Sequence, residues 1–170
     1  ASEDAEAPAE DETPAVPETP QEPAEKTFTD VPEGKWYTEA VAYVVEAGLM
    51  SGATEGTFAP KAELTGEELA AIAKAMDADA TVAADGTVTR EALVKFLFAA
   101  AGIEAVTTEE NLESFGDQDQ ISEDAVMMMN WAVGQGILTG RTENQLAPQE
   151  AVTRAECAVM LMRCAEAVGQ

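Results

Sequence analysis

The sequence predicts an all-α fold. Five segments repeat apolar side chains at the spacing of one helix face, and no segment shows a convincing strand alternation. Aromatic residues make up only 5% of the chain, while 46% of it is hydrophobic and alanine is abundant. This composition favours a helical core of small aliphatic side chains. The 170 residues allow one or two small domains and are enough to bury a sizeable core.

The first two helices are predicted over residues 36–47 and 65–76. The first ends before Gly48, and glycine is a common helix terminator. Thr65 and Glu68 have the spacing of a capping box, in which each side chain satisfies a backbone N–H group at the helix start. The apolar stripes comprise Ala40, Val41, Val44 and Val45 in the first helix and Leu69, Ile72, Ala73 and Met76 in the second.

The same reasoning predicts three further helices, over residues 89–101, 121–134 and 153–168. Thr153 and Glu156 form a second capping box at the start of the last helix. The apolar stripes comprise Leu93, Phe96, Leu97 and Ala100, then Ala125, Met128, Met129 and Ala132, then Ala158, Leu161, Met162 and Ala165.

The N-terminal segment differs from the rest of the chain. Residues 1–26 hold nine acidic residues, five prolines and one lysine, with almost no large apolar side chain. Such a segment cannot bury enough apolar surface to offset the entropy of ordering it. We therefore expect residues 1–27 to be a disordered, acidic, Pro/Glu-rich spacer.

Charge and composition exclude several functions. The chain has 33 acidic and nine basic residues, for a net charge of −24, which disfavours binding to nucleic acid or to an anionic membrane surface. It has no histidine, so histidine-dependent catalysis and histidine zinc sites are excluded. A calcium loop centred on Gly86 would place Ala92 where the bidentate acid belongs. We expect no metal, no cofactor and no enzymatic activity.

The sequence also bears on where the protein acts. The longest apolar run, residues 96–103, is far too short to span a membrane. No basic segment followed by an apolar one stands at the start, so we expect a secreted protein whose signal peptide has been removed. Cys157 and Cys164 would lie about 10 Å apart on one helix, too far for a disulfide. They are predicted to be buried thiols.

The chain repeats itself at an offset of 88 residues. The segment 47–52 matches 135–140, and Thr65 and Glu68 align with Thr153 and Glu156. Further aligned pairs are Tyr43 with Trp131, Phe58 with Leu146, and Pro60 with Pro148. A third copy, Val88-Thr-Arg-Glu91 with its helix, matches only the second half of the unit. The arrangement is therefore two full repeats on either side of half a repeat.

These motifs resemble those of the S-layer homology (SLH) domain of bacterial surface proteins. Residues 28–31 read Phe-Thr-Asp-Val and are followed by Trp36. Residues 52–60 form a Gly-x-x-x-Gly-x-Phe-x-Pro loop, and residues 153–156 read Thr-Arg-Ala-Glu. The resemblance implies a compact, pseudo-threefold helical unit over 28–170. Its repeats are expected at 28–77, 78–104 (truncated) and 115–168.

The resemblance also implies a function. The family typically binds secondary cell-wall polysaccharide non-covalently, often anionic polymers bearing pyruvate ketals, with the arginines of the Thr-Arg-Ala-Glu motif near the ligand. A guanidinium can bind a carboxylate through two parallel hydrogen bonds. By position, the expected ligand-binding residues are Arg90, Arg154, Trp36, Gly52, Gly56 and Gly140. Asp30 and Asp117 are expected to cap or orient helices.

Two departures from the family pattern leave an alternative open. Gly66 stands at the first of the three arginine positions, and the last loop reads Asn144-Gln-Leu146 in place of Gly-Thr-Phe. With the truncated middle repeat, these changes predict weaker or more salt-dependent wall binding. The alternative is a secreted, soluble interaction protein that uses the same scaffold to bind a protein partner. An exposed apolar patch near residues 127–131 would favour it. The chain could equally be a fragment of a longer surface protein.

Overall fold

A computed structural model describes residues 28–78, 85–104 and 111–169. These residues form five α-helices and no strand, which confirms the all-α prediction. The spacer predicted for residues 1–27 lies outside the described residues. The helices are α1 (Thr38–Glu46), α2 (Gly66–Ala75), α3 (Arg90–Ala100), α4 (Val126–Gly134) and α5 (Arg154–Val168), with short 3-10 turns η2 (Gln118–Gln120) and η3 (Glu123–Ala125) before α4.

Threonines begin three of the helices. Thr65, Thr89 and Thr153 are the N-cap residues of α2, α3 and α5, and each side chain accepts the backbone N–H three residues later. Both predicted capping boxes are present. By contrast, α4 begins at Val126, later than predicted. Its N-cap residue, Ala125, has no side chain that could cap a helix, so the preceding residues form a 3-10 turn.

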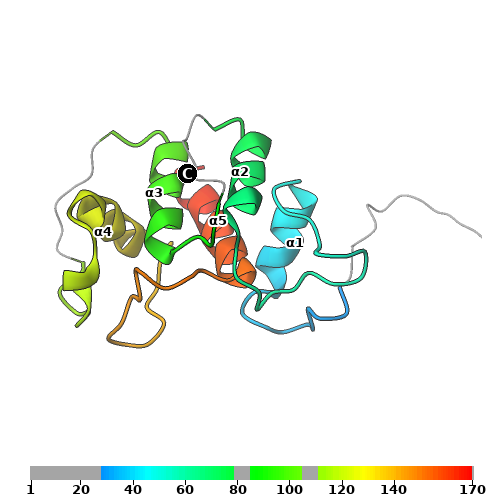
Figure 1. Cartoon of the computed structure of the whole chain (residues 1–170), viewed down its shortest axis with the longest axis horizontal. Coiled ribbons are helices and arrows are strands. Elements are labelled where there is room, and N and C mark those ends of the chain that lie inside the picture. The colour runs from blue at the N-terminus through cyan, green and yellow to red at the C-terminus, as the bar shows by residue number, and fades with distance from the viewer. Residues whose placement is uncertain (1–27, 79–84, 105–110, 170) are drawn as a thin grey trace, which may run out of the picture.

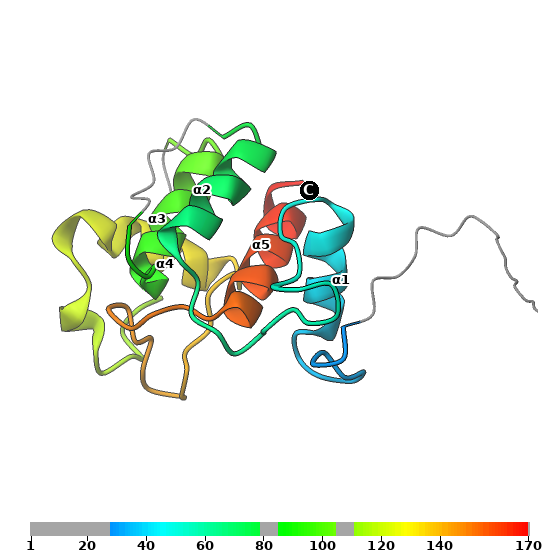
Figure 2. The same ribbon diagram turned by 45° about the vertical axis from the view of Figure 1, so that its right-hand side comes forward.

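The helices form a central group with two flanking members (Figures 1 and 2). Helices α2, α3 and α5 lie at the centre, while α1 and α4 lie on opposite sides. Helix α1 packs against α5, and α4 packs against α3. Two long loops, over residues 50–64 and 139–152, run beneath the central helices in the view of Figure 1. Each loop leads into the second helix of a full repeat.

A ring of three backbone hydrogen bonds marks the pseudo-threefold axis. The N–H of Leu64 donates to the carbonyl of Val152 (2.8 Å), that of Val152 to Val88 (2.8 Å), and that of Val88 to Leu64 (3.0 Å). These residues stand one position before the three N-cap threonines. A second set of backbone hydrogen bonds has the same symmetry. In it the N–H groups of Gly66, Arg90 and Arg154 donate to the carbonyls of Gly86 (2.9 Å), Glu150 (2.9 Å) and Ala62 (2.8 Å), respectively. The three repeats are therefore related at the level of the backbone.

The missing half-repeat leaves α2 without a flanking helix among the described residues. On α3, Phe98 is buried and meets Trp131 of α4 edge to face, with ring centroids 5.3 Å apart. The matching position on α2 is Lys74, which is exposed. A charged residue can stand there because no helix covers it.

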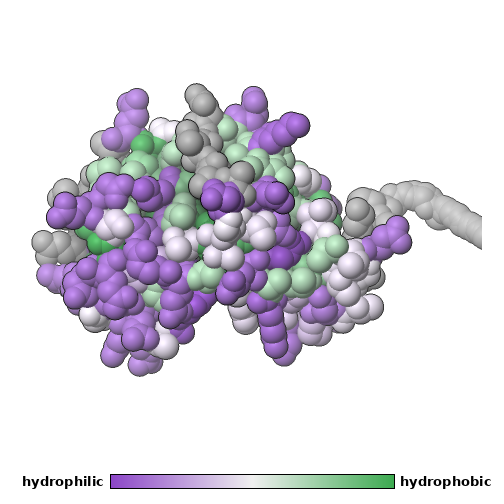
Figure 3. Space-filling model, in the orientation of Figure 1, coloured by the Kyte–Doolittle hydropathy of each residue, from purple (hydrophilic) through white to green (hydrophobic). Residues whose placement is uncertain are grey.

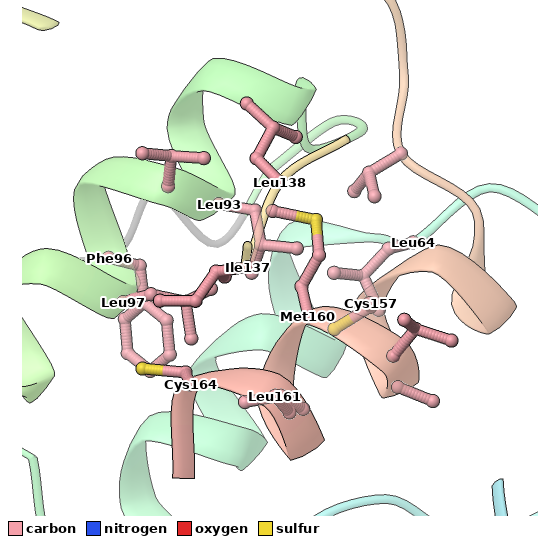
Figure 4. Close-up of a cluster of buried hydrophobic side chains, with 14 of the residues drawn as sticks. Leu64, Leu93, Phe96, Leu97, Ile137, Leu138, Cys157, Met160, Leu161 and Cys164 are labelled. Atoms are coloured by element: carbon pink, nitrogen blue, oxygen red, sulfur yellow. The ribbon is translucent and has the colours of Figure 1, made fainter. Parts of the chain in front are cut away.

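Apolar residues from all five helices contribute to the core. Figure 4 shows Leu93 and Leu97 of α3 in one cluster with Met160 and both cysteines of α5. Cys157 and Cys164 are buried and free, as the sequence predicts. The face of the molecule seen in Figure 3 is mostly hydrophilic. No helix in the described part of the chain is long and apolar enough to cross a membrane.

Candidate functional site

Arg90, the first residue of α3, holds the loop that precedes α5. Its Nε donates to the carbonyl of Leu146 (2.7 Å) and its Nη2 to that of Thr139 (2.7 Å). Its Nη1 forms an ion pair with Glu156. The residue is only 3% exposed. Each guanidinium nitrogen therefore has a partner within the chain, and the side chain ties the middle repeat to the last one.

Arg154, the first residue of α5, makes the same contacts with the first repeat. It donates to the carbonyls of Phe58 (2.8 Å) and Ser51 (2.5 Å) and pairs with Glu68. Each partner stands 88 residues before the corresponding partner of Arg90. The guanidinium also lies over the ring of Phe58, 4.6 Å from its centroid, where a cation is attracted to the ring face.

This pattern explains why Gly66 stands at the first of the three arginine positions. An arginine at Gly66 would hold the loop of the middle repeat, as Arg90 and Arg154 hold the loops of the last and first repeats. The middle repeat is too short to contain such a loop. Because the middle repeat has no such loop, an arginine at position 66 would have no loop to hold.

Two aspartates hold the same loops from the other side. Asp30 accepts the N–H groups of Phe58 (2.8 Å) and Ala59 (2.7 Å). Asp117 does the same for Leu146 (2.9 Å) and Ala147 (2.8 Å). The two alanines have φ values of 58° and 52°, a left-handed conformation that is strained for a residue with a side chain. The aspartates therefore hold the loops, whereas the sequence predicts that they cap or orient helices.

The three loop glycines differ in how tightly they are packed. A Cβ atom on Gly52 would lie 2.5 Å from a ring carbon of Phe28, and one on Gly140 would lie 2.8 Å from the equivalent carbon of Phe115. Both would also lie within 3.0 Å of backbone oxygens. A Cβ on Gly56 would meet nothing within 4 Å. Only the first two positions require glycine for close approach.

Glu156 is the electrostatic centre of the loop before α5. It accepts the backbone N–H of Thr153 (3.0 Å) and pairs with both Arg90 and Arg141. Burial disfavours its ionised form, but the hydrogen bonds from Arg141 and Thr153 and the nearby positive charges outweigh burial, so its pKa is lowered. Burial lowers the pKa of Arg90, and the charge of Glu156 opposes that shift. The hydrogen bond to Glu156 raises the pKa of Arg141.

A pocket of about 230 Å³ lies beside this network, where the three repeats meet. Trp36 of the first repeat is 64% exposed and forms one wall. Arg90 of the middle repeat and Gly140 of the last repeat form others. The remaining lining residues are Ile137, Leu138, Thr139, Glu156, Val159, Met160 and Arg163.

The pocket brings together half of the residues expected to bind ligand. Trp36, Arg90 and Gly140 line it. Gly52 and Gly56 lie in the other loop, next to α2, which Arg154 of α5 holds through Ser51. Ligand contact by these six residues stays a prediction. Among the described residues, no cluster of three or more acidic or cysteine side chains is placed to hold a metal ion.

Sequence reasoning missed Arg163, which also lines the pocket. No hydrogen bond or ion pair joins its side chain to another described residue. A signal for it existed in the sequence. The spacing along α5 places four residues on one helix face, namely Glu156, Val159, Met160 and Arg163. Once Glu156 was assigned to the site, this spacing could have predicted that Arg163 lies on the same side.

Comparison with known proteins defines the class. The model of the S-layer homology domain matches residues 27–70 and 114–158, slightly more than half of the chain. The chain therefore belongs to the S-layer homology domain family. The two matched segments lie in the two full repeats and end within α2 and α5, and the truncated middle repeat lies between them.

One relative adds to this assignment. The chain is 28% identical over 144 residues to the surface-layer 125 kDa protein of Lysinibacillus sphaericus. The alignment covers 83% of this chain and 10% of the relative, so the chain spans about a tenth of the relative's length. The family and the relative support a cell-surface module of the cell-wall-anchoring kind, with a structural, non-catalytic role.

Proposed function

We propose that the chain anchors itself to the cell surface by binding secondary cell-wall polysaccharide in the pocket between Trp36 and Arg163. The observation that carries the proposal is the exposure of Trp36. A tryptophan that is 64% exposed adds little to the core, yet this one stands at the rim of a pocket that also contains a cation. Aromatic and apolar lining residues together with a few polar groups are typical of ligand pockets.

The pocket suits one small unit of a polymer. Pockets that hold drug-sized ligands measure roughly 300–1,000 Å³, and this one is about 230 Å³. Its lining includes the apolar residues Ile137, Val159 and Met160. Trp36 can contact the apolar face of a sugar. Gly140 lines the pocket too, and its lack of a Cβ lets the loop pack against Phe115. The rest of the polymer would lie along the surface outside.

Arg90, Arg154, Gly52 and Gly56 support the site in this proposal. The two arginines hold the loops in place through their carbonyl and glutamate contacts. Gly52 lets its loop pack against Phe28. The loops are thereby ordered before any ligand arrives, so the polymer does not have to provide the free energy of ordering them.

The net charge of −24 makes binding to an anionic polymer dependent on salt. Repulsion between the acidic surface and the polymer acts at long range and is screened beyond about 8 Å at physiological ionic strength. Contacts inside the pocket are much shorter than that. Added salt should therefore first reduce the general repulsion and only then weaken the local contacts.

A protein partner is the second candidate, and the structure gives it less support. Val126 and Met127 are 42% and 46% exposed, but Met129 and Trp131 in the same helix are buried. The exposed apolar surface of this helix is thus limited to two neighbouring side chains. Patches that mark protein interfaces are larger.

Co-sedimentation with cell walls tests the proposal. The full chain is mixed with walls of the organism that encodes it, either native or chemically stripped of secondary polymer, at low and physiological salt. We expect binding to native walls alone and a loss of at least about tenfold in Trp36→Ala, because such aromatic contacts carry much of a site's binding free energy. Met127→Ala is the matched control, since it removes an exposed apolar side chain outside the pocket. Equal binding to native and stripped walls, or to neither, would refute the proposal.

A further inference from the structure

We infer that Arg163 binds the anionic substituent of the wall polymer, a carboxylate or a phosphate, and that the chain has a single such site. This inference rests on the proposed function. It concerns a residue outside the segments matched by the family model, the second of which ends at residue 158. The Thr-Arg-Ala-Glu motif therefore does not account for Arg163.

The first step is that Arg163 is the available cation of the pocket. Arg90 is buried, and each of its guanidinium nitrogens has a partner within the chain. Arg141, close by, pairs with Glu150 and Glu156. Arg163 has no partner among the described residues and is partly exposed on the pocket wall. An anion entering the pocket would find an unpaired guanidinium only there.

The second step is geometric. Arg163 stands two helical turns after Glu156, on the same face of α5, with Val159 and Met160 between them. The cation and the acid are therefore at opposite ends of an apolar strip. An anionic group would be attracted most to the Arg163 end, because the charge there is unpaired, whereas the charges of Glu156, Arg90 and Arg141 at the other end already compensate one another. The apolar strip between the two ends would contact the sugar. This polarity would orient the ligand in the pocket.

The third step concerns the place beside Arg154 that the repeat symmetry relates to the pocket beside Arg90. The position on α2 that corresponds to Arg163 is Ala75, and the one on α3 is Ala99. The residue that matches Trp36 there would belong to the missing half of the middle repeat. Among the described residues, the place beside Arg154 therefore has no counterpart of either Arg163 or Trp36. The truncation that removed the loop of the middle repeat therefore leaves the pocket beside Arg90 as the site that has both the aromatic side chain and the unpaired cation.

Two variants of Arg163 test the inference on the full chain. Arg163→Gln removes the charge, and Arg163→Lys keeps it while losing the planar fork. Binding to native walls is measured by co-sedimentation over a range of salt concentrations. We expect Arg163→Gln to bind at least about tenfold more weakly, because losing a hydrogen bond to a charged group weakens binding by about that factor or more. The affinity of Arg163→Lys should fall between those of Arg163→Gln and the parent. The salt dependence of Arg163→Gln should be shallower.

Lys74→Gln is the matched control. It makes the same change in net charge on α2, beside the counterpart position Ala75, and should bind as the parent does. All variants should keep the parent's urea unfolding midpoint, because neither side chain has a partner to lose. Equal binding of Arg163→Gln and the parent would overturn the inference while the proposed function stands. Absence of binding by the parent would instead refute the proposed function.

A second arm distinguishes the two anionic substituents. Amidation of wall carboxylates with a carbodiimide and an amine neutralises carboxylates and leaves phosphates charged. If the difference between the parent and Arg163→Gln disappears on amidated walls, Arg163 binds a carboxylate. If the difference persists, it binds a phosphate. A difference that also persists on stripped walls would overturn the inference.

Discussion

Arg154 and Glu68 join two helices through one carboxylate. Glu68 accepts the backbone N–H of Thr65 (2.8 Å) and so completes the capping box of α2. The same carboxylate pairs with Arg154, at the first position of α5. Arg90 and Glu156 repeat the arrangement between α3 and α5. Each glutamate therefore both begins its own helix and holds the neighbouring repeat.

Removing Arg154 should destabilise the protein strongly. Arg154→Ala leaves two loop carbonyls and Glu68 without their donor, at a site where the arginine side chain is 6% exposed. Loss of one partner of a buried ion pair costs about 3–5 kcal/mol. We expect a decrease in unfolding free energy of about 3 kcal/mol, measured by urea denaturation followed by circular dichroism.

A double-mutant cycle with Glu68→Gln isolates the ion pair from the carbonyl contacts. A coupling energy near zero would mean that the pair itself adds nothing. An unchanged unfolding midpoint in Arg154→Ala would contradict the role of the arginine as a loop clamp.

The loop glycines should differ in their tolerance of alanine. Gly52→Ala and Gly140→Ala place a Cβ atom against an aromatic ring and backbone oxygens, and overpacking of this kind costs about 1–3 kcal/mol. Gly56→Ala is the matched control, because its Cβ would meet nothing and its φ is not positive. It should be neutral or stabilising by about 0.4–1 kcal/mol. Thermal unfolding of the three variants checks this, and equal losses in all three would contradict it.

Glu156 should make stability dependent on acid pH. Its pKa in the folded chain lies below the ordinary value of 4.5, so the ionised carboxylate stabilises the folded state above that value. The contribution is lost as the pH falls through the lowered pKa. The difference in unfolding free energy between the parent and Glu156→Gln should therefore be largest at neutral pH and shrink below about pH 4.5.

Glu123→Gln serves as the control for this titration. Glu123 is exposed in the 3-10 turn before α4 and forms no ion pair with the described residues. Its substitution should change stability little at any pH. A Glu156→Gln difference that stays constant down to about pH 3 would show that the lowered pKa does not contribute to stability.

Both cysteines should be unreactive in the folded protein. Burial raises the pKa of the Cys157 thiol far above its usual range and that of Cys164 to about 11. The thiolate is the reactive form, so a thiol reagent at about pH 8 should react slowly with native protein. In urea both thiols should react at the rate of a free thiol. Rapid reaction of one thiol in the native state would contradict the burial of that residue.

The helices were predictable because their signals are local. Apolar spacing and the Thr65–Glu68 and Thr153–Glu156 pairs lie within one helix or one turn, and the structure confirms them. The start of α4 was misplaced because Ala125 offers no capping side chain, a feature that periodicity does not register. The repeat offset likewise needed only the order of residues.

The function of the arginines required the tertiary structure. A Thr-Arg-Ala-Glu motif shows that a guanidinium is present, but not that residues such as Phe58 and Ser51 occupy its donors. Those partners come from another repeat, and nothing in the local pattern encodes the pairing. The sequence could therefore place Arg90 and Arg154 near a groove without distinguishing a clamp from a ligand contact.

Some properties of the protein follow from the order of residues along the chain, and others only from contacts between residues far apart in the sequence. The amino-acid order alone predicted five helices, a truncated middle repeat and a resemblance to the S-layer homology domain, since these depend on spacing along the chain. Only folding brought Trp36 of the first repeat and Arg163 of the last to the lining of one pocket. It did so because the backbone ring of Leu64, Val88 and Val152 closes the three repeats around one axis. The pocket is a product of that closure.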